Sequence, residues 1–173
     1  CNLKCDFCDT KYAWKANEKM LFSDIVDSIN TYSSYCNAVV FTGGEPLLYA
    51  RQLTMVKEQL GNFPFITIET NGTLYDEPFL RDTFVSVSPK LEGMGKDVWY
   101  DLECITEIVT KHLAQLKFVI VRPLDYDEAK EIVKTVRFRD QYYRGPISII
   151  LQPNGLVEEK EYIPSLSKLC MLA

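Results

Sequence analysis

The stretch AVVFTGGEP, residues 38–46, joins four apolar residues to a polar turn that contains two glycines and a proline. Val39, Val40 and Phe41 are β-branched or aromatic, and such residues are enriched in strands. Proline is favoured at the first position of a helix, so Pro46 indicates that a helix begins where the turn ends. The stretch therefore predicts a strand, a tight turn and a helix in succession.

Four further runs share this composition and also predict strands. They lie at 65–68, 84–87, 118–121 and 147–151. None of them alternates cleanly between apolar and polar residues, and this lack of alternation is typical of strands that are covered on both faces. The strand pattern therefore predicts a parallel sheet with helices on its two faces.

Amphipathic patterns between the strands predict helices. Apolar residues recur three or four positions apart in 22–32, 53–60, 102–113 and 129–136. Ser23 is a suitable N-cap, Gly61 lies at a C′ position, and Asp125 and Asp127 lead into the last helix. A shorter segment, 77–81, has room for a turn or two. Strands that alternate with helices predict right-handed βαβ units and an α/β fold.

Polar segments that contain glycine, proline or both follow four of the predicted strands. They are 42–46, 69–73, 88–90 and 152–155. In parallel α/β folds, ligand sites lie beyond the carboxyl ends of the strands. We therefore expect these four segments to meet and form one site.

Three of the six cysteines, Cys1, Cys5 and Cys8, stand within the first eight residues. Disulfides between such close neighbours would close strained small rings. A structural zinc site usually has four ligands, and the single histidine, His112, is distant in sequence. Three thiolates suit an iron–sulfur cluster that leaves one iron open. A zinc loop completed by a distant cysteine and a chance grouping are the alternatives.

The spacing C-x3-C-x2-C, followed by Gly-Gly-Glu-Pro after the next strand, resembles the radical S-adenosylmethionine (SAM) superfamily. The resemblance implies a partial parallel (β/α)6-type barrel that lacks its first strand here. It also implies a single core domain over residues 1–173, truncated at both ends. Cys1, Cys5 and Cys8 would then bind a 4Fe–4S cluster, and SAM would chelate the fourth iron and be cleaved to a 5′-deoxyadenosyl radical.

The same resemblance implies cofactor-binding residues at the strand ends. They are Gly43, Gly44, Glu45, Pro46, Glu69, Asn71, Ser88, Lys90 and Gln152. Two glycines would let a ligand approach the backbone closely. The carboxylate of Glu45 would accept hydrogen bonds from a ligand ammonium group. No catalytic residue is expected beyond the groups that hold the cluster and the cofactor.

The run CDTKYAW, residues 8–14, resembles more narrowly the 7-carboxy-7-deazaguanine synthase family. That resemblance implies a lyase of queuosine precursor biosynthesis, which converts 6-carboxy-5,6,7,8-tetrahydropterin to 7-carboxy-7-deazaguanine with loss of ammonia. It implies that Thr10 binds Mg²⁺ beside the substrate. From the residue alone, a hydroxyl that caps a nearby backbone group is the alternative. Phe7, Tyr12 and Trp14 are candidates to pack around the cluster and exclude water.

Two other functions share some of these features. An activase of a glycyl-radical enzyme would have the same cysteine loop, residues 1–8, and the same Gly-Gly-Glu-Pro turn, residues 43–46, which we call the glycine turn. The run CDTKYAW argues against this function. A non-catalytic iron–sulfur electron-transfer module, or a zinc module, is the third hypothesis. The radical SAM interpretation implies a small-molecule pterin substrate and an electron donor such as flavodoxin or ferredoxin, and it is compatible with a homodimer.

The composition limits the remaining partners. The formal net charge is −5, whereas a nucleic-acid-binding protein usually carries a basic face. No apolar run approaches the ~20 residues that span a bilayer, and no signal peptide is visible, so we expect a cytoplasmic protein. Cys36, Cys104 and Cys170 are predicted to be buried free thiols. His112 is predicted to complement the dipole at a helix end.

Overall fold

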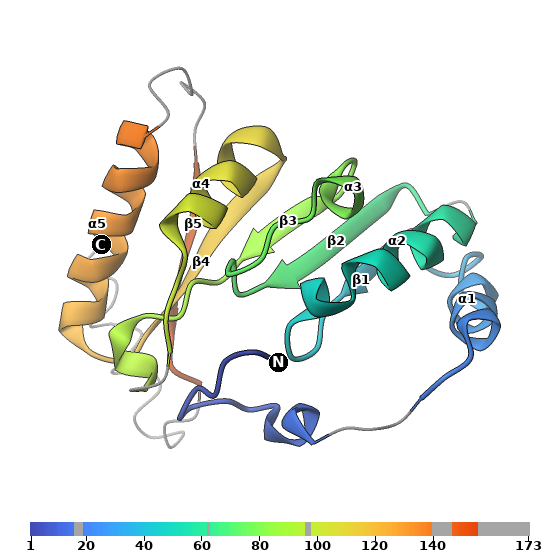
Figure 1. Cartoon of the computed structure of the whole chain (residues 1–173), viewed down its shortest axis with the longest axis horizontal. Helices are drawn as coiled ribbons and strands as arrows, with labels where there is room; N and C mark the ends of the chain where they lie inside the picture. Colours follow the sequence, from blue (N-terminus) through green and yellow to red (C-terminus); the bar gives the residue numbers. More distant parts are fainter. Residues whose placement is uncertain (16–18, 62, 96–97, 140–146, 156–173) are drawn as a thin grey trace.

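The computed structural model describes residues 1–15, 19–61, 63–95, 98–139 and 147–155. In this part of the chain five parallel strands form one sheet (Figure 1). The strands are β1 (Ala38–Phe41), β2 (Phe65–Thr70), β3 (Phe84–Val87), β4 (Ala114–Ile120) and β5 (Ser148–Pro153). Their order in the sheet is β1-β2-β3-β4-β5, so each strand pairs with the next one in the sequence. The predicted α/β fold is confirmed.

Helices precede the sheet or connect its strands. The α-helices are α1 (Phe22–Thr31), α2 (Ala50–Gln59), α3 (Glu77–Leu80), α4 (Leu102–Lys111) and α5 (Pro123–Arg139). Short 3₁₀ helices are η1 (Lys11–Trp14), η2 (Pro46–Tyr49) and η3 (Glu92–Met94). No helix in the described segments combines the length and the apolar character that a membrane crossing requires.

The main core lies between the helices and one face of the sheet. Phe41 and Ile68 on the strands belong to the same buried cluster as Ile105 of α4. On the opposite face, the side chains of Val40 and Phe65 are 54% and 60% exposed. The expectation of strands covered on both faces is therefore wrong for β1 and β2, whereas β3 has buried residues on both of its faces. Right-handed crossovers that advance in one direction across a sheet place their helices on the same face.

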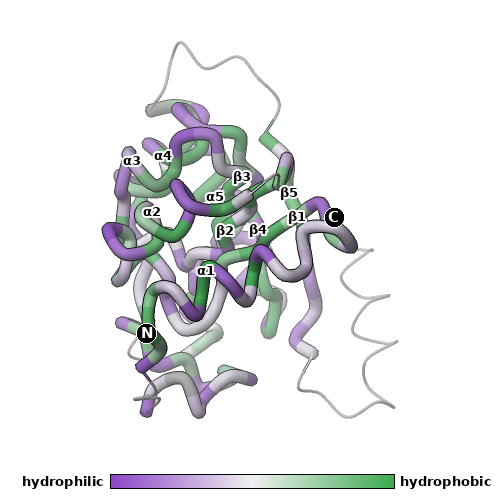
Figure 2. The backbone as a smooth tube through the Cα atoms, turned by 90° about the vertical axis from the view of Figure 1, so that its right-hand side faces the viewer, coloured by the Kyte–Doolittle hydropathy of each residue, from purple (hydrophilic) through white to green (hydrophobic). Residues whose placement is uncertain are grey.

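Figure 2 shows that apolar residues are concentrated on the strands and that hydrophilic residues are frequent on the helices. The cysteine-rich N-terminal segment lies below the strand ends in Figure 1, beside the turns that follow the strands. The open face of the sheet and these strand ends together provide space for a ligand.

Several predicted boundaries and caps need correction. Strand β4 begins at Ala114 and not at 118, and its side chains alternate between half-buried and buried positions. Leu21 is the N-cap of α1, whereas the Ser23 hydroxyl donates to Asp24. Gly61 does not take a left-handed conformation, and its N–H donates to the Asn30 side chain at 2.8 Å.

Helix α5 begins six residues earlier than the apolar pattern predicts. The buried carboxylate of Asp125 accepts hydrogen bonds from the N–H groups of Val121 and Arg122, at 3.0 and 2.8 Å. These bonds fix the turn between β4 and α5, so Asp125 lies inside the first turn of the helix and not before it.

The predicted free thiols differ from expectation, and the histidine does so in part. Cys36 is exposed, Cys104 is half-buried, and Cys170 lies outside the described residues. Burial raises the pKa of Cys104 to about 11, which keeps its thiol protonated at neutral pH. His112 contacts the Tyr75 hydroxyl at 3.2 Å, and burial lowers its pKa. His112 is the C-cap residue of α4, so its predicted place at a helix end is confirmed, and the lowered pKa favours the neutral ring, which interacts less with the helix dipole.

Candidate functional site

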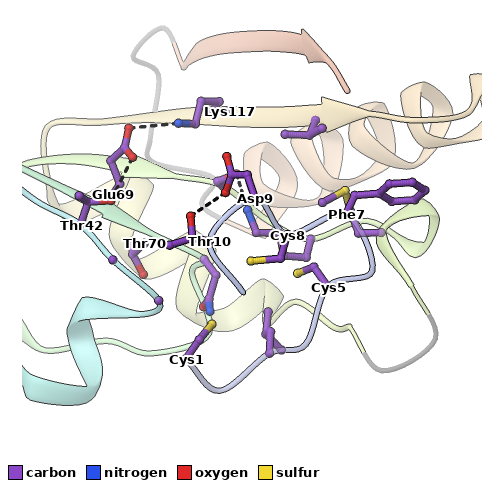
Figure 3. Close-up of a pocket in the computed structure, with 18 of the residues that line it drawn as sticks. Cys1, Cys5, Phe7, Cys8, Asp9, Thr10, Thr42, Glu69, Thr70 and Lys117 are labelled. Atoms are coloured by element: carbon purple, nitrogen blue, oxygen red, sulfur yellow. Dashed lines mark hydrogen bonds and ion pairs between the residues drawn. The ribbon is translucent and has the colours of Figure 1, made fainter. Parts of the chain in front are cut away.

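A cavity of about 410 Å³ lies where the carboxyl ends of the strands meet the N-terminal cysteines (Figure 3). All four predicted strand-end segments contribute to its wall. The predicted residues that line it are Cys1, Cys5, Cys8, Thr10, Gly43, Gly44, Glu69, Asn71, Ser88, Lys90 and Gln152. The structure thus brings together residues that are up to 151 positions apart, and it leaves only Glu45 and Pro46 out of the wall.

The three cysteines of the cysteine loop, residues 1–8, face a common space in Figure 3. Cys1 is exposed, Cys5 is buried and Cys8 is half-buried. No three cysteine, histidine, aspartate or glutamate side chains in the described segments lie close enough to hold a single metal ion. Three thiolates on one loop are the ligand number that suits a cluster with one open iron.

The cysteine loop is attached to the body of the protein near both ends. The Asp6 N–H donates to the Met94 carbonyl at 2.8 Å, and Met94 packs with Leu3 and Cys5 in a small buried cluster. Near the start of the loop, the side chain of Asn2 is hydrogen-bonded to residues that follow β2. These contacts hold the thiols against the strand ends.

Gly44 lies directly against Cys1. A Cβ atom at Gly44 would lie 2.8 Å from both the Cβ and the backbone nitrogen of Cys1, which is closer than such atoms approach. Gly43 has a φ of +136°, which L side chains rarely adopt, and a Cβ there would meet nothing within 4 Å. The first glycine therefore shapes the turn, and the second allows the cysteine loop to approach it.

Glu45 supports the wall from behind. Its carboxylate is 2% exposed and accepts hydrogen bonds from Leu47 N–H at 3.0 Å, from the Thr70 hydroxyl at 2.9 Å and from Asn71 N–H at 2.7 Å. Burial raises its pKa, and these hydrogen bonds oppose the rise. The prediction that Glu45 faces a ligand ammonium is therefore corrected, because the carboxylate is occupied by protein donors. Pro46 is buried and begins η2, which confirms the prediction that a helix starts where the turn ends.

Lys90 lies beside the buried thiol of the loop. Its ammonium donates to the Ser88 hydroxyl at 2.9 Å. Burial lowers the pKa of Lys90, and the nearby Cys5 opposes the change. Burial likewise raises the pKa of Cys5, and Lys90 opposes that rise. A cation in this position favours the thiolate, which is the form that binds metal.

An ion pair crosses the sheet at the opposite wall of the cavity (Figure 3). Lys117 Nζ lies 3.1 Å from Glu69 Oε1, and the Thr42 hydroxyl donates to Glu69 Oε2 at 3.3 Å. Sequence reasoning missed Lys117 because the predicted strand began one residue after it. The alternation of polar Gln115 and Lys117 with apolar Leu116 and Phe118 was the signal that could have found it.

Thr10 lines the cavity next to the cysteines, and its hydroxyl donates to Asp9 Oδ1 at 2.7 Å. The hydroxyl makes no cap to the backbone of η1, so the capping alternative is not what the structure shows. Asp9 and Thr10 offer a carboxylate and a hydroxyl, and oxygen ligands are those that Mg²⁺ prefers. Phe7 and Trp14 also line the cavity, whereas Tyr12 is 77% exposed and does not.

The sequence profile of the Radical SAM superfamily matches residues 1–98, which include the cysteine loop, the glycine turn and strands β1 to β3. The match covers more than half of the 173 residues. This chain belongs to the radical SAM superfamily. The predicted superfamily is thus confirmed, and the structure places the two motifs that predicted it on one cavity.

Relatives of this radical SAM chain bear the name 7-carboxy-7-deazaguanine synthase. The protein from Halobacterium salinarum is 29% identical over 175 residues, which cover 90% of this chain and 66% of the relative. The protein from Aquifex aeolicus is 29% identical over 159 residues, covering 90% and 65%. The protein from Hyperthermus butylicus is 41% identical over 97 residues, covering 52% and 40%. The chain spans less than two thirds of the length of each of these relatives.

The fold also matches a solved structure. The crystal structure of SuiB from Streptococcus suis bound to S-adenosylmethionine has a TM-score of 0.65 with 17% sequence identity. The match covers 99% of this chain and 40% of that one. At this identity the likeness shows a shared α/β architecture.

Proposed function

We propose that this chain forms the catalytic core of an enzyme that converts 6-carboxy-5,6,7,8-tetrahydropterin to 7-carboxy-7-deazaguanine with loss of ammonia. The observation that carries the proposal is the position of Asp9 and Thr10. They extend the cysteine loop into the same cavity as the glycine turn, and they belong to the run that resembles the synthase family. Relatives with the name of that synthase support the proposal.

Cys1, Cys5 and Cys8 would hold a 4Fe–4S cluster, with Lys90 favouring the thiolate of Cys5. SAM would lie against Gly43 and the neighbouring strand ends, where the backbone is accessible. When bound, the cluster and SAM supply a radical that removes hydrogen from C6 of the pterin. An electron donor such as flavodoxin or ferredoxin would reduce the cluster.

The chain's own residues would bind and orient the substrate. Asp9 and Thr10 would hold Mg²⁺ together with substrate oxygens and water, because one hydroxyl and one carboxylate do not complete an octahedron. The ion would then fix the substrate and polarise developing charge. Phe7 and Trp14 would keep water away from the reacting atoms. A cytoplasmic location and a homodimer remain predictions.

The test has two stages. The purified protein is reconstituted anaerobically with iron and sulfide, and absorbance and electron spin resonance are recorded with and without SAM. We expect the spectrum of the cluster to change when SAM is added. A spectrum that does not change would favour an electron-transfer module. The carboxypterin is then added, and the deazaguanine product is sought by mass spectrometry. SAM cleavage without this product, under any magnesium concentration, would count against the substrate assignment.

A further inference from the structure

Asn71 lies where three segments of the wall meet. Its N–H donates to Oε2 of the buried Glu45 in the glycine turn, at 2.7 Å. Its Oδ1 accepts hydrogen bonds from the N–H and the hydroxyl of Thr73, at 3.0 and 2.6 Å. Its Nδ2 donates to Oδ1 of Asn2 in the cysteine loop, at 2.9 Å. One residue therefore connects the glycine turn, the end of β2 and the cysteine loop.

The side chains of Asn2, Asn71 and Thr73 close a ring, which we call the amide clasp. Asn2 Nδ2 donates to the Thr73 hydroxyl at 2.7 Å, and that hydroxyl in turn donates to Asn71 Oδ1. Asn71 and Thr73 are 5% and 4% exposed, so the hydrogen bonds between them are shielded from competing water, whereas the two bonds to the exposed Asn2 are partly buried. Three of the four side-chain hydrogen-bonding positions of Asn71 are thus used within the protein.

The clasp acts on the Cys1 end of the loop. Asn2 follows Cys1 directly, and the next residue, Leu3, is 2% exposed. Leu3 packs with Cys5 and Met94, so release of Asn2 also loosens the packing that shields Cys5, while the bond between Asp6 N–H and the Met94 carbonyl holds the far end of the loop. Asn2 itself is exposed, so its contribution comes from its two hydrogen bonds and not from burial.

We propose that Asn71 is a positioning residue, which holds the cysteine loop against the glycine turn through Asn2 and does not bind the cofactor with its side chain. The role rests on the proposed function in one respect, namely that the loop carries a cluster. The clasp keeps Cys1 beside Gly44 before any cluster is present, so the thiols are already close to their working positions when iron arrives.

The test begins on the cluster-free protein with Asn2→Ala and a matched control. Asn30 also makes two side-chain hydrogen bonds, to Gly61 N–H and to the Gln59 carbonyl, but between α1 and the end of α2. Iodoacetamide labelling is followed at each cysteine by mass spectrometry. Asn2→Ala should raise the labelling rate of Cys5 about three- to tenfold, as expected for losing one or two hydrogen bonds. Asn30→Ala should leave that rate unchanged.

Exposed Cys36 is the internal reference, and its rate should be the same in all variants. Asn71→Ala should also raise the labelling rate of Cys5, but by less than Asn2→Ala, because the bond from Asn2 Nδ2 to the Thr73 hydroxyl remains. The double variant should exceed Asn2→Ala by little, because the contact between Asn2 and Asn71 is already lost. If Asn71→Ala fails to fold, Asn2→Ala still decides. Unchanged Cys5 labelling in Asn2→Ala, or fully additive effects, would overturn the proposal.

A second measurement uses the reconstituted protein. Iron release to a chelator should be about three- to tenfold faster in Asn2→Ala than in wild type or Asn30→Ala, for the same loss of hydrogen bonds. Equal release from all three would overturn the link between the clasp and the cluster. If Cys5 labelling changes as expected but the wild-type cluster does not cleave SAM, the clasp stands and the proposed function fails. The two proposals are therefore separable.

Discussion

At the residue scale, the proposed Mg²⁺-binding role of Thr10 makes a specific prediction. If Thr10 binds Mg²⁺, Thr10→Ala should leave the cluster and SAM binding nearly unchanged. Turnover of the carboxypterin should fall about tenfold, the lower range for lost positioning in a catalytic site, and its magnesium dependence should weaken. Thr10→Ser keeps the hydroxyl and should lie closer to wild type. Activity is titrated against magnesium for the three proteins, and parallel curves for wild type and Thr10→Ala would refute the ligand role.

His112 gives a pH-dependent prediction. Burial lowers its pKa, so below the ordinary value near 6.5 the unfolded chain binds a proton that the folded chain resists. The contribution of His112 to the free energy of unfolding is therefore fully present above that value, and it is lost as the pH falls from there toward the lower pKa of the folded state. Since the chain has one histidine, its imidazole resonance identifies it directly. The NMR titration midpoint should lie below 6.5, and His112→Gln should lose less stability between pH 7 and pH 5 than wild type.

Single residues were predictable where their chemistry is carried by spacing along the chain. Cys1, Cys5 and Cys8 form a recognisable pattern before any fold is known. Glu45 was misplaced because its surroundings come from residues 25 and 26 positions away, Thr70 and Asn71, which occupy its carboxylate. No local pattern reveals that a carboxylate is satisfied by distant donors.

At the element scale, the glycine turn has two positions with different requirements. A side chain at Gly44 would collide with Cys1, whereas one at Gly43 would enter open space on a strained backbone. Gly44→Ala should therefore impair iron incorporation, which iron and sulfide analysis measures. Gly43→Ala should keep the cluster and lose about 1–3 kcal/mol of stability from its backbone conformation. Full iron loading in Gly44→Ala would show that the loop need not lie against the turn.

Glu45 makes the turn depend on the neighbouring strand. Glu45→Ala leaves three donors of the protein without their acceptor, and we expect the free energy of unfolding to fall by about 2 kcal/mol. Urea denaturation measures the loss. Glu58→Ala, at an exposed position of α2, is the control and should change little. If both variants lost the same amount, the hydrogen bonds of Glu45 would contribute nothing specific to the turn.

Elements were predicted well where composition alone identifies them, and less well where partners matter. Five strands were expected and the described residues form five, but β4 was predicted to begin too late because Gln115 and Lys117 face the half-open side. Serine is a common N-cap residue, so Ser23 was predicted to cap the helix, yet the N-cap is Leu21, two residues earlier. The side on which the helices pack follows from strand order, which no single element contains.

At the scale of the whole molecule, a bound cluster would fix the three cysteines of residues 1–8 relative to one another and so stabilise the folded site. Because the cluster would bind the folded site and not the unfolded chain, loading should raise the melting temperature by several degrees. Calorimetry before and after anaerobic reconstitution measures the shift, and a chelator should reverse it. Hydrogen exchange should slow at residues 1–8 far more than in α5. Full iron content with an unchanged melting temperature would mean that iron is held outside the folded cavity.

The order of strands in the sheet has a consequence for synthesis on the ribosome. Because β1 to β5 pair in the order in which they are translated, each new strand can dock on a finished edge, and none must insert between two earlier ones. The cysteine loop is different, since its partners Asn71, Thr73 and Met94 emerge long after it. Its thiols are translated before these partners, and the loop can be held in place only after Met94 has left the exit tunnel. Until then they are exposed to oxidation and to stray metals, so iron delivery is best timed late in synthesis or after it.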